Sequence, residues 1–156
     1  MLKKLLKQLH KKLLKNKKTL ATAESCTGGL LSARLTETSG SSQYFLLGVI
    51  TYSDKAKEKI LGIPAKIIAK HKAASSQVAI LMAKNIRKKF NTDFGLSVTG
   101  IAGPTKTTTD KPVGTVYICL SSKNKNSCQK FIFSGSRQKI RKKSTLQALR
   151  LLFNNL

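Results

Sequence analysis

The chain has 156 residues, a length that suits one domain with a single hydrophobic core. No apolar run approaches the roughly 20 residues that a membrane span needs, and the N-terminus lacks the pattern of a signal peptide. We therefore expect a cytoplasmic protein with no membrane partner. Thirty Lys and Arg residues face six Asp and Glu residues, and the formal net charge of +24 favours partners that carry phosphate groups.

This positive charge is spread along the whole chain rather than gathered in one segment. Aromatic residues are not interleaved with the basic ones, and no known nucleic-acid-binding motif is present. Nucleic acid is therefore an open alternative that the sequence does not favour. A small phosphorylated substrate is compatible with the same charge.

Apolar periodicity predicts helices and strands that alternate through most of the chain. We expect a basic amphipathic helix over residues 1–18, with its leucine stripe in the core rather than on a membrane. The elements expected next are a strand over 19–24, a helix over 27–38, a buried strand over 45–53, a helix over 55–61 capped by Asp54, and a helix from Pro64. After these we expect a helix through Phe90 capped by Ser75 or Ser76, a strand over 94–99, a hairpin of strands 113–121 and 128–133, and a helix over 137–154.

Helices that alternate with strands early, followed by a late hairpin, predict an α/β fold. Its mixed sheet should be covered by helices on both faces. No linker or internal repeat interrupts the pattern, so residues 1–156 are expected to form a single domain.

The stretch ATAESCTGG at residues 21–29 places three hydroxyl or thiol groups between a predicted strand and a predicted helix. Gly28 and Gly29 would let the backbone approach a ligand and would present N–H groups to an oxyanion or a phosphate. Two other predicted strands also end in polar or small residues, in VITYSDKAK and VTGIAGP. In open α/β sheets ligands bind at the carboxyl ends of the strands, so these segments are expected to converge.

Tyr52 precedes Lys57 by five residues in YSDKAK. A serine, a lysine and a tyrosine make a workable hydrolase set without histidine, provided that the lysine is neutral. Burial or nearby positive charge would lower its pKa. The alternative is a solvated surface lysine, and the residues alone leave both interpretations open.

The three cysteines, Cys26, Cys119 and Cys128, are an odd number without the spacing of metal ligands. This pattern argues against a disulfide framework and against a zinc site.

Five motifs, AESCTGG, VITYSDKAK, VTGIAGP, KPVGTVY and FSGSRQKIR, occur in this order across roughly residues 9–152. Together they resemble the CinA C-terminal domain family, the nicotinamide mononucleotide (NMN) amidohydrolases. The resemblance implies a three-layer α/β/α sandwich that hydrolyses NMN to nicotinic acid mononucleotide and ammonia without a metal ion or other cofactor. It also implies a homo-oligomer, and the chain looks like the stand-alone form of the family.

The resemblance also implies roles for individual residues. Ser25 would be the nucleophile, Lys57 the general base and Tyr52 the hydrogen-bonding companion of the lysine. Independently of the resemblance, we expect Cys26 to be a small apolar residue behind the turn and Thr27 to be a helix N-cap. The residues expected to bind substrate are Gly28, Gly29, Thr99, Gly100 and Gly103, with Arg137 or Arg141 holding the phosphate.

Three departures from the family pattern concern substrate choice. The run PTKTTTDKP lacks the glycines that usually follow GIAGP, Lys72 stands where a glycine is common, and Ser136 replaces an acid. Two alternatives therefore stay open. One is an amidase for another pyridine nucleotide or small amide, and the other is a non-catalytic, competence-linked regulatory module.

Overall fold

The computed structural model describes residues 1–106 and 109–156, so part of the predicted polar loop after Pro104 lies outside the described residues. Five strands form one sheet: β1 (Leu20–Glu24), β2 (Phe45–Ile50), β3 (Phe94–Gly100), β4 (Thr115–Ser121) and β5 (Asn126–Ile132). The helices are α1 (Leu2–Lys15), α2 (Leu30–Leu35), α3 (Asp54–Leu61), α4 (Ala65–His71), α5 (Ser76–Phe90) and α6 (Arg137–Phe153), with a short 3-10 helix at Ser41–Gln43.

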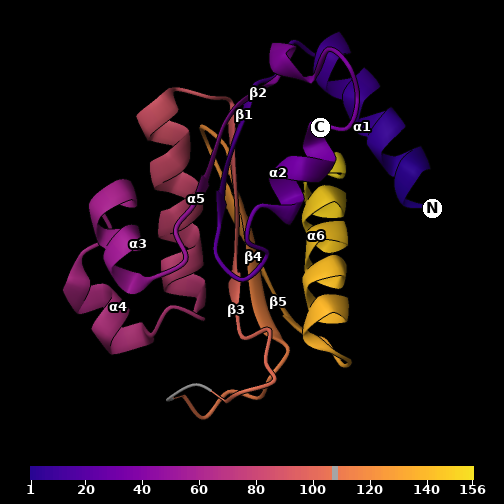
Figure 1. Ribbon diagram of the computed structural model, residues 1–156. Helices are drawn as coiled ribbons and strands as arrows, with labels where there is room; N and C mark the ends of the chain where they lie inside the picture. The colour runs from indigo at the N-terminus through magenta and orange to yellow at the C-terminus, as the bar shows by residue number, and fades with distance from the viewer. Residues whose placement is uncertain (107–108) are drawn as a thin grey trace.

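The sheet is mixed and has the order β2-β1-β3-β4-β5. Strand β1 pairs in parallel with β2 and β3, whereas β4 runs antiparallel to both β3 and β5. Helices α3, α4 and α5 cover one face, and α2 and α6 cover the other, with α1 packed beyond them (Figure 1). The predicted three-layer α/β/α sandwich is confirmed, and the carboxyl ends of β1, β2 and β3 lie at the same end of the sheet.

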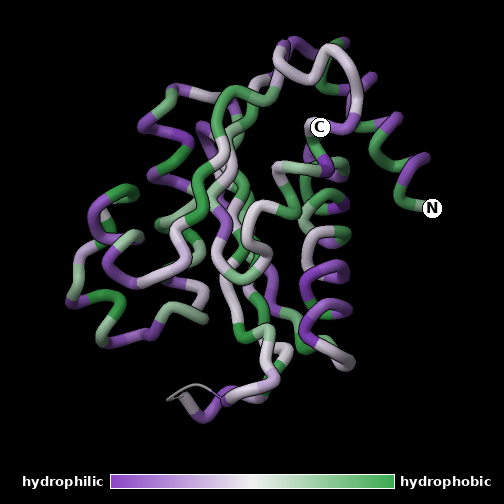
Figure 2. The backbone as a smooth tube through the Cα atoms, in the orientation of Figure 1, coloured by the Kyte–Doolittle hydropathy of each residue, from purple (hydrophilic) through white to green (hydrophobic). Residues whose placement is uncertain are grey.

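Helix α1 buries its leucine stripe, as predicted. Leu6, Leu9 and Leu13 are buried in the core that α6 also lines, while Lys12 lies over the Phe153 ring, 4.3 Å from its centroid. Apolar and polar segments alternate along this helix (Figure 2). Of the helices in the described residues, none is both long and apolar enough to cross a membrane.

Strand β2 is not the buried strand that its composition predicts. It lies at the edge of the sheet, and exposure alternates along it, with Leu46 41% and Ile50 54% exposed. Apolar composition therefore misled the prediction, because an edge strand has a neighbour on one side only.

Helix α2 begins three residues later than predicted. Gly28 and Gly29 have φ angles of 57° and 93°, so the chain makes a left-handed turn before the helix and Gly29 becomes the N-cap. Thr27 is therefore not the cap, and its buried hydroxyl has no hydrogen-bond partner among the described residues. Similarly, Ser53 rather than Asp54 caps α3, because its Oγ accepts from the N–H of Ala56 at 3.1 Å.

The prediction against disulfides is wrong. Cys119 and Cys128 lie directly opposite each other in the β4–β5 register and are joined by a disulfide, which leaves buried Cys26 as the free cysteine. Cysteine counting could not reveal this pair, because the hairpin register decides which side chains meet across two antiparallel strands.

Candidate active site

A cavity of about 550 Å³ opens at the carboxyl ends of the parallel strands. Its walls come from the segments after β1, β2 and β3, from the α4–α5 connection and from the start of α6. The lining residues are Ser25, Cys26, Tyr52, Asp54, Lys57, Lys72, Ala73, Ala74, Thr99, Gly100, Ile101, Ala102, Gly103, Pro104, Thr105, Thr109 and Arg137. The predicted convergence of three strand ends is therefore confirmed.

Ser25 and Lys57 form a hydrogen-bonded pair inside this cavity. The Nζ of Lys57 donates to the Oγ of Ser25 at 3.2 Å and to the carbonyl oxygen of Thr51 at 2.9 Å. Ser25 is 8% exposed and Lys57 only 1%. The lysine is therefore the buried partner of the serine rather than a solvated surface charge.

Burial lowers the pKa of Lys57 below its ordinary value of 10.5, because desolvation disfavours the ammonium form. The nearby charge of Asp54 acts in the opposite direction, but the net pKa is still lowered. A lysine in this state loses its proton more readily than one in water. It can therefore accept the proton of the Ser25 hydroxyl.

Cys26 also touches the cavity, but its environment suppresses its reactivity. Burial raises the pKa of this thiol to about 12. Since the thiolate is the nucleophilic form, Cys26 stays protonated and inert at neutral pH. Ser25, paired with a base, is the better nucleophile in this site.

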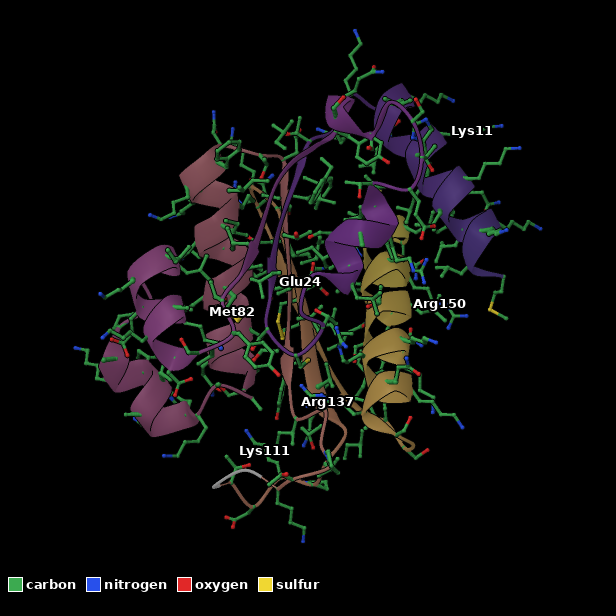
Figure 3. The ribbon with its side chains drawn as sticks, viewed as in Figure 1. Lys11, Glu24, Met82, Lys111, Arg137 and Arg150 are labelled. Atoms are coloured by element: carbon green, nitrogen blue, oxygen red, sulfur yellow. A yellow bond between two sulfur atoms is a disulfide. The ribbon has the colours of Figure 1, made fainter. Side chains whose placement is uncertain are left out.

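Glu24 occupies the helix start that was expected to hold an oxyanion. Its carboxylate is fully buried and accepts from the N–H groups of Gly29 at 3.0 Å, Leu31 at 3.1 Å and Ser32 at 2.8 Å. The hydroxyl of Ser32 donates to it as well, at 2.7 Å. Figure 3 shows Glu24 between the sheet and α2. The predicted oxyanion site at the glycine pair is therefore wrong, because the Gly29 N–H already donates to this carboxylate and the Gly28 N–H donates to the Ser25 carbonyl at 3.0 Å.

Gly28 and Gly29 are accordingly not among the described residues that line the cavity. Sequence reasoning left the role of Glu24 unassigned. An acid shortly before a glycine-rich helix start was the available signal, since carboxylates favour the positive end of a helix.

The two candidate arginines have different surroundings. Arg137 lines the cavity and donates to the Gly103 carbonyl at 2.7 Å and to the Tyr52 hydroxyl at 2.5 Å. Arg141 instead donates to the Thr27 carbonyl at 2.7 Å and packs over Gly28, where an added Cβ would lie 3.3 Å from its Nη2. Only Arg137 reaches the space where a substrate would lie.

Tyr52 is placed differently from its predicted role. Its side chain is 57% exposed, and its hydroxyl accepts a hydrogen bond from Arg137 rather than pairing with Lys57. It therefore orients a cation at the cavity mouth, while the Thr51 carbonyl orients the buried lysine.

Thr99, Gly100 and Gly103 all line the cavity, as expected. The hydroxyl of Thr99 donates to the Ala73 carbonyl at 3.0 Å and so joins β3 to the α4–α5 connection. Gly103 has a φ of 70° and a Cβ there would lie 2.4 Å from a Val113 side-chain carbon, so this turn requires glycine. In the described residues, no group of three or more His, Cys, Asp or Glu residues could hold a metal ion.

The fold and the site define an α/β protein with a buried serine–lysine pair at the carboxyl ends of parallel strands. The family model of the CinA C-terminal domain matches residues 2–156, and the chain belongs to this family. Among solved structures, the competence/damage inducible protein CihA from Agrobacterium tumefaciens has a TM-score of 0.94 at 32% identity, covering 98% of this chain and 94% of that one. A CinA superfamily protein from Escherichia coli has a TM-score of 0.96 at 29% identity, covering 100% and 91%.

Curated relatives share more of the sequence but are longer. A competence-damage inducible protein from Thermoanaerobacter pseudethanolicus is 52% identical over 139 residues, which are 89% of this chain and 34% of the relative. A CinA-like protein from Citrifermentans bemidjiense is 49% identical over 131 residues, 84% of this chain and 32% of the relative. The chain thus spans about a third of the length of these relatives.

Proposed function

We propose that the chain hydrolyses the carboxamide of NMN to nicotinic acid mononucleotide and ammonia. The single observation that carries this proposal is the hydrogen bond between Ser25 and a buried Lys57 inside a cavity that Arg137 also lines. The serine supplies a nucleophile, the lysine a base with a lowered pKa, and the arginine a charge that a nucleotide phosphate could meet.

In the acylation step, neutral Lys57 takes the proton from the Ser25 hydroxyl while Oγ attacks the carboxamide carbon. The Thr51 carbonyl accepts a hydrogen bond from Nζ and so holds the lone pair of the amine toward the serine. The tetrahedral intermediate collapses when the protonated lysine gives its proton to the departing nitrogen. Ammonia leaves, and an ester joins Oγ to the pyridine carbonyl.

In the deacylation step, a water molecule attacks the ester carbon and gives a proton to Lys57. Oγ then leaves and recovers this proton, which restores the Ser25 hydroxyl and the neutral amine. The product is nicotinic acid mononucleotide, and the cycle consumes one water without an oxidant or a reductant. Lys57 acts as base and acid in turn, a role that suits a pKa below that of an ordinary lysine.

Arg137 is the proposed phosphate-binding residue. Its guanidinium has five N–H donors, and the hydrogen bonds to Gly103 and Tyr52 fix its plane at the cavity mouth. A planar fork held in this way can bind two oxygens of one phosphate. Figure 3 shows this residue at the edge of the sheet where the loop after β3 begins.

The test is ammonia release from NMN by the purified protein, with nicotinic acid mononucleotide measured in the same reaction. Wild type should turn over, Ser25→Ala should lose at least about a thousandfold in kcat, and the exposed Ser42→Ala should match wild type. Near-full activity of Ser25→Ala would overturn the serine mechanism. Release of ammonia from another amide but not from NMN would move the proposal to that substrate.

Self-association stays a prediction from the sequence, and nucleic-acid binding stays an alternative that the sequence does not favour. Sedimentation at several protein concentrations tests the first. The salt dependence of nucleic-acid binding tests the second. The affinity for a DNA duplex should fall by about 0.9 log unit per log unit of salt concentration for each phosphate that the protein contacts. Binding that disappears near physiological salt would reflect the net charge of +24 alone.

A further inference from the structure

Lys72, in the connection between α4 and α5, has a backbone conformation that belongs to glycine. Its φ is 65° and its ψ is 160°. A side chain in this region clashes with its own backbone, so nearly all residues found there are glycines. A lysine at such a position calls for a reason, and Lys72 lines the cavity of the candidate active site.

Side chains from three directions hold this strained segment in place. The Lys72 carbonyl accepts from the Ser75 hydroxyl at 2.7 Å, the Ala73 carbonyl accepts from Thr99 at 3.0 Å, and the Ala74 carbonyl accepts from Lys111 Nζ at 2.5 Å. The Lys72 N–H also donates to the Ile68 carbonyl at 2.8 Å. Strained backbone of this kind persists only where its surroundings fix it, as they do here.

The ammonium group of Lys72 is available to a ligand. Within residues 1–106 and 109–156, no hydrogen bond or ion pair engages its Nζ, and the residue is exposed. The other charged groups on the lining are Asp54, Lys57 and Arg137. Lys57 is buried against Ser25 and Arg137 comes from α6, across the sheet from α4 and α5. Lys72 therefore brings a second accessible cation to the cavity, from the opposite layer of the sandwich.

We propose that Lys72 is a specificity-determining residue whose ammonium binds the phosphate of a nucleotide substrate together with Arg137. This inference rests on the proposed function, because NMN is the phosphate-bearing substrate considered. Two cations from opposite layers can contact different oxygens of one phosphate, a dianion that a single guanidinium neutralises only in part. The strained backbone then serves to aim the lysine at the ligand.

The test separates the charge of Lys72 from its strain. Lys72→Met removes the charge and keeps a side chain at the strained position, so KM for NMN should rise about tenfold while kcat changes less than twofold. The dephosphorylated analogue, nicotinamide riboside, should show no such rise. Lys72→Arg should retain most of the affinity for NMN.

Lys72→Gly should raise KM in the same way and should also raise Tm by about 2–4 °C, because it relieves the strain. Lys17→Gly is the matched control, since this exposed lysine also has a positive φ, 49°, but precedes β1 at the other end of the sheet. It should leave KM unchanged. An unchanged KM in Lys72→Met, or an equal rise with nicotinamide riboside, would overturn the inference.

Binding measurements keep this inference separate from the proposed function. NMN and inorganic phosphate are each titrated into two proteins in a calorimeter, the single variant Ser25→Ala and the double variant Ser25→Ala with Lys72→Met. Weaker binding in the double variant supports the role of Lys72 even if wild type releases no ammonia, in which case only the proposed reaction fails. Equal binding in the two proteins, or no binding in either, would overturn the role of Lys72 even if NMN is hydrolysed.

Discussion

The Nζ of Lys57 lies 3.2 Å from the Oγ of Ser25, although the two residues are 32 positions apart in the chain. The serine follows β1 and the lysine lies in α3, which follows the neighbouring parallel strand β2. Parallel pairing therefore brings a nucleophile and a base together at one edge of the sheet. The pairing also buries the lysine, and this burial sets its proton affinity.

The pH dependence of turnover should report the protonation of Lys57. The base must be neutral, and burial lowers its pKa from 10.5, so kcat/KM should rise with pH and have its midpoint below pH 10.5. Initial rates between pH 6 and pH 11 measure this profile. A midpoint at or above 10.5 would mean that the base is an ordinary solvated lysine.

The lowered pKa of Lys57 should also make the stability difference between Lys57→Met and wild type depend on pH. The lowered pKa means that the unfolded chain binds this proton more tightly, so wild-type stability rises with pH through the window between the lowered pKa and 10.5. Methionine has no such cost, so at pH 7 the variant should be more stable than wild type. Urea unfolding at pH 7 and pH 10.5 should show that the difference in unfolding free energy between the two proteins is smaller at pH 10.5. A difference that does not change with pH would contradict the lowered pKa of Lys57.

Glu24→Gln should destabilise the fold because a buried carboxylate accepts four hydrogen bonds at the start of α2. The amide replaces an acceptor with a donor and leaves buried N–H groups unpaired, which costs about 2–3 kcal/mol. The control is Glu37→Gln, an exposed acid paired with Arg34, expected to cost less than about 0.5 kcal/mol. Chemical denaturation compares them, and equal losses would show that the cap is not a major source of stability.

Substitutions of Arg137 and of Arg141 should have different effects on KM for NMN. Arg137→Lys removes the planar fork from the cavity mouth and should raise KM for NMN about tenfold or more. Arg141→Lys changes a contact to the Thr27 carbonyl outside the cavity and should alter KM less than threefold. Steady-state kinetics on the two variants decide the assignment, and the reverse order would place the phosphate against the glycine turn.

The disulfide between Cys119 and Cys128 should be visible in a thiol count. Denatured but unreduced protein should react at one thiol, Cys26, and reduced protein at three. Reduction should lower the free energy of unfolding by about 2–3 kcal/mol, since the bond closes a short loop in the unfolded chain. KM should not change, because neither half-cystine is among the described cavity residues. Three reactive thiols before reduction would show that the bond is absent.

Much of the fold follows from local patterns. The sequence predicts a helix through Phe90 that is capped by Ser75 or Ser76, and α5 spans Ser76–Phe90 with Ser75 as its N-cap. This agreement arises because helix periodicity and capping depend on neighbours a few residues apart. The exposure of β2 and the pairing of Cys119 with Cys128 were not predictable in this way, because strand order and hairpin register bring distant segments together.

The candidate site divides in the same manner. Ser25, Lys57 and Thr99 could be placed near one another, because each belongs to a segment that ends or follows a predicted parallel strand. The partners of Tyr52 and Glu24 were not predicted. Tyr52 meets Arg137 rather than Lys57, and Glu24 takes the N–H groups that were assigned to an oxyanion. The Tyr52 contact depends on α6, which packs against the site from the other end of the chain, whereas the Glu24 contacts lie within eight residues and depend on the left-handed turn at Gly28 and Gly29.

By itself, the sequence determined the order of helices and strands, the α/β class and the segments that carry the chemistry, because periodicity and strand-end residues are local properties. Only the tertiary structure decided which side chains meet. It buried Lys57 against Ser25 and so lowered the pKa of the lysine, and it brought Arg137 rather than Arg141 to the cavity. It also held Lys72 in a glycine-type conformation through contacts from β3 and from the segment before β4. Burial, register and strain arise from residues far apart in the chain, so no local pattern encodes them.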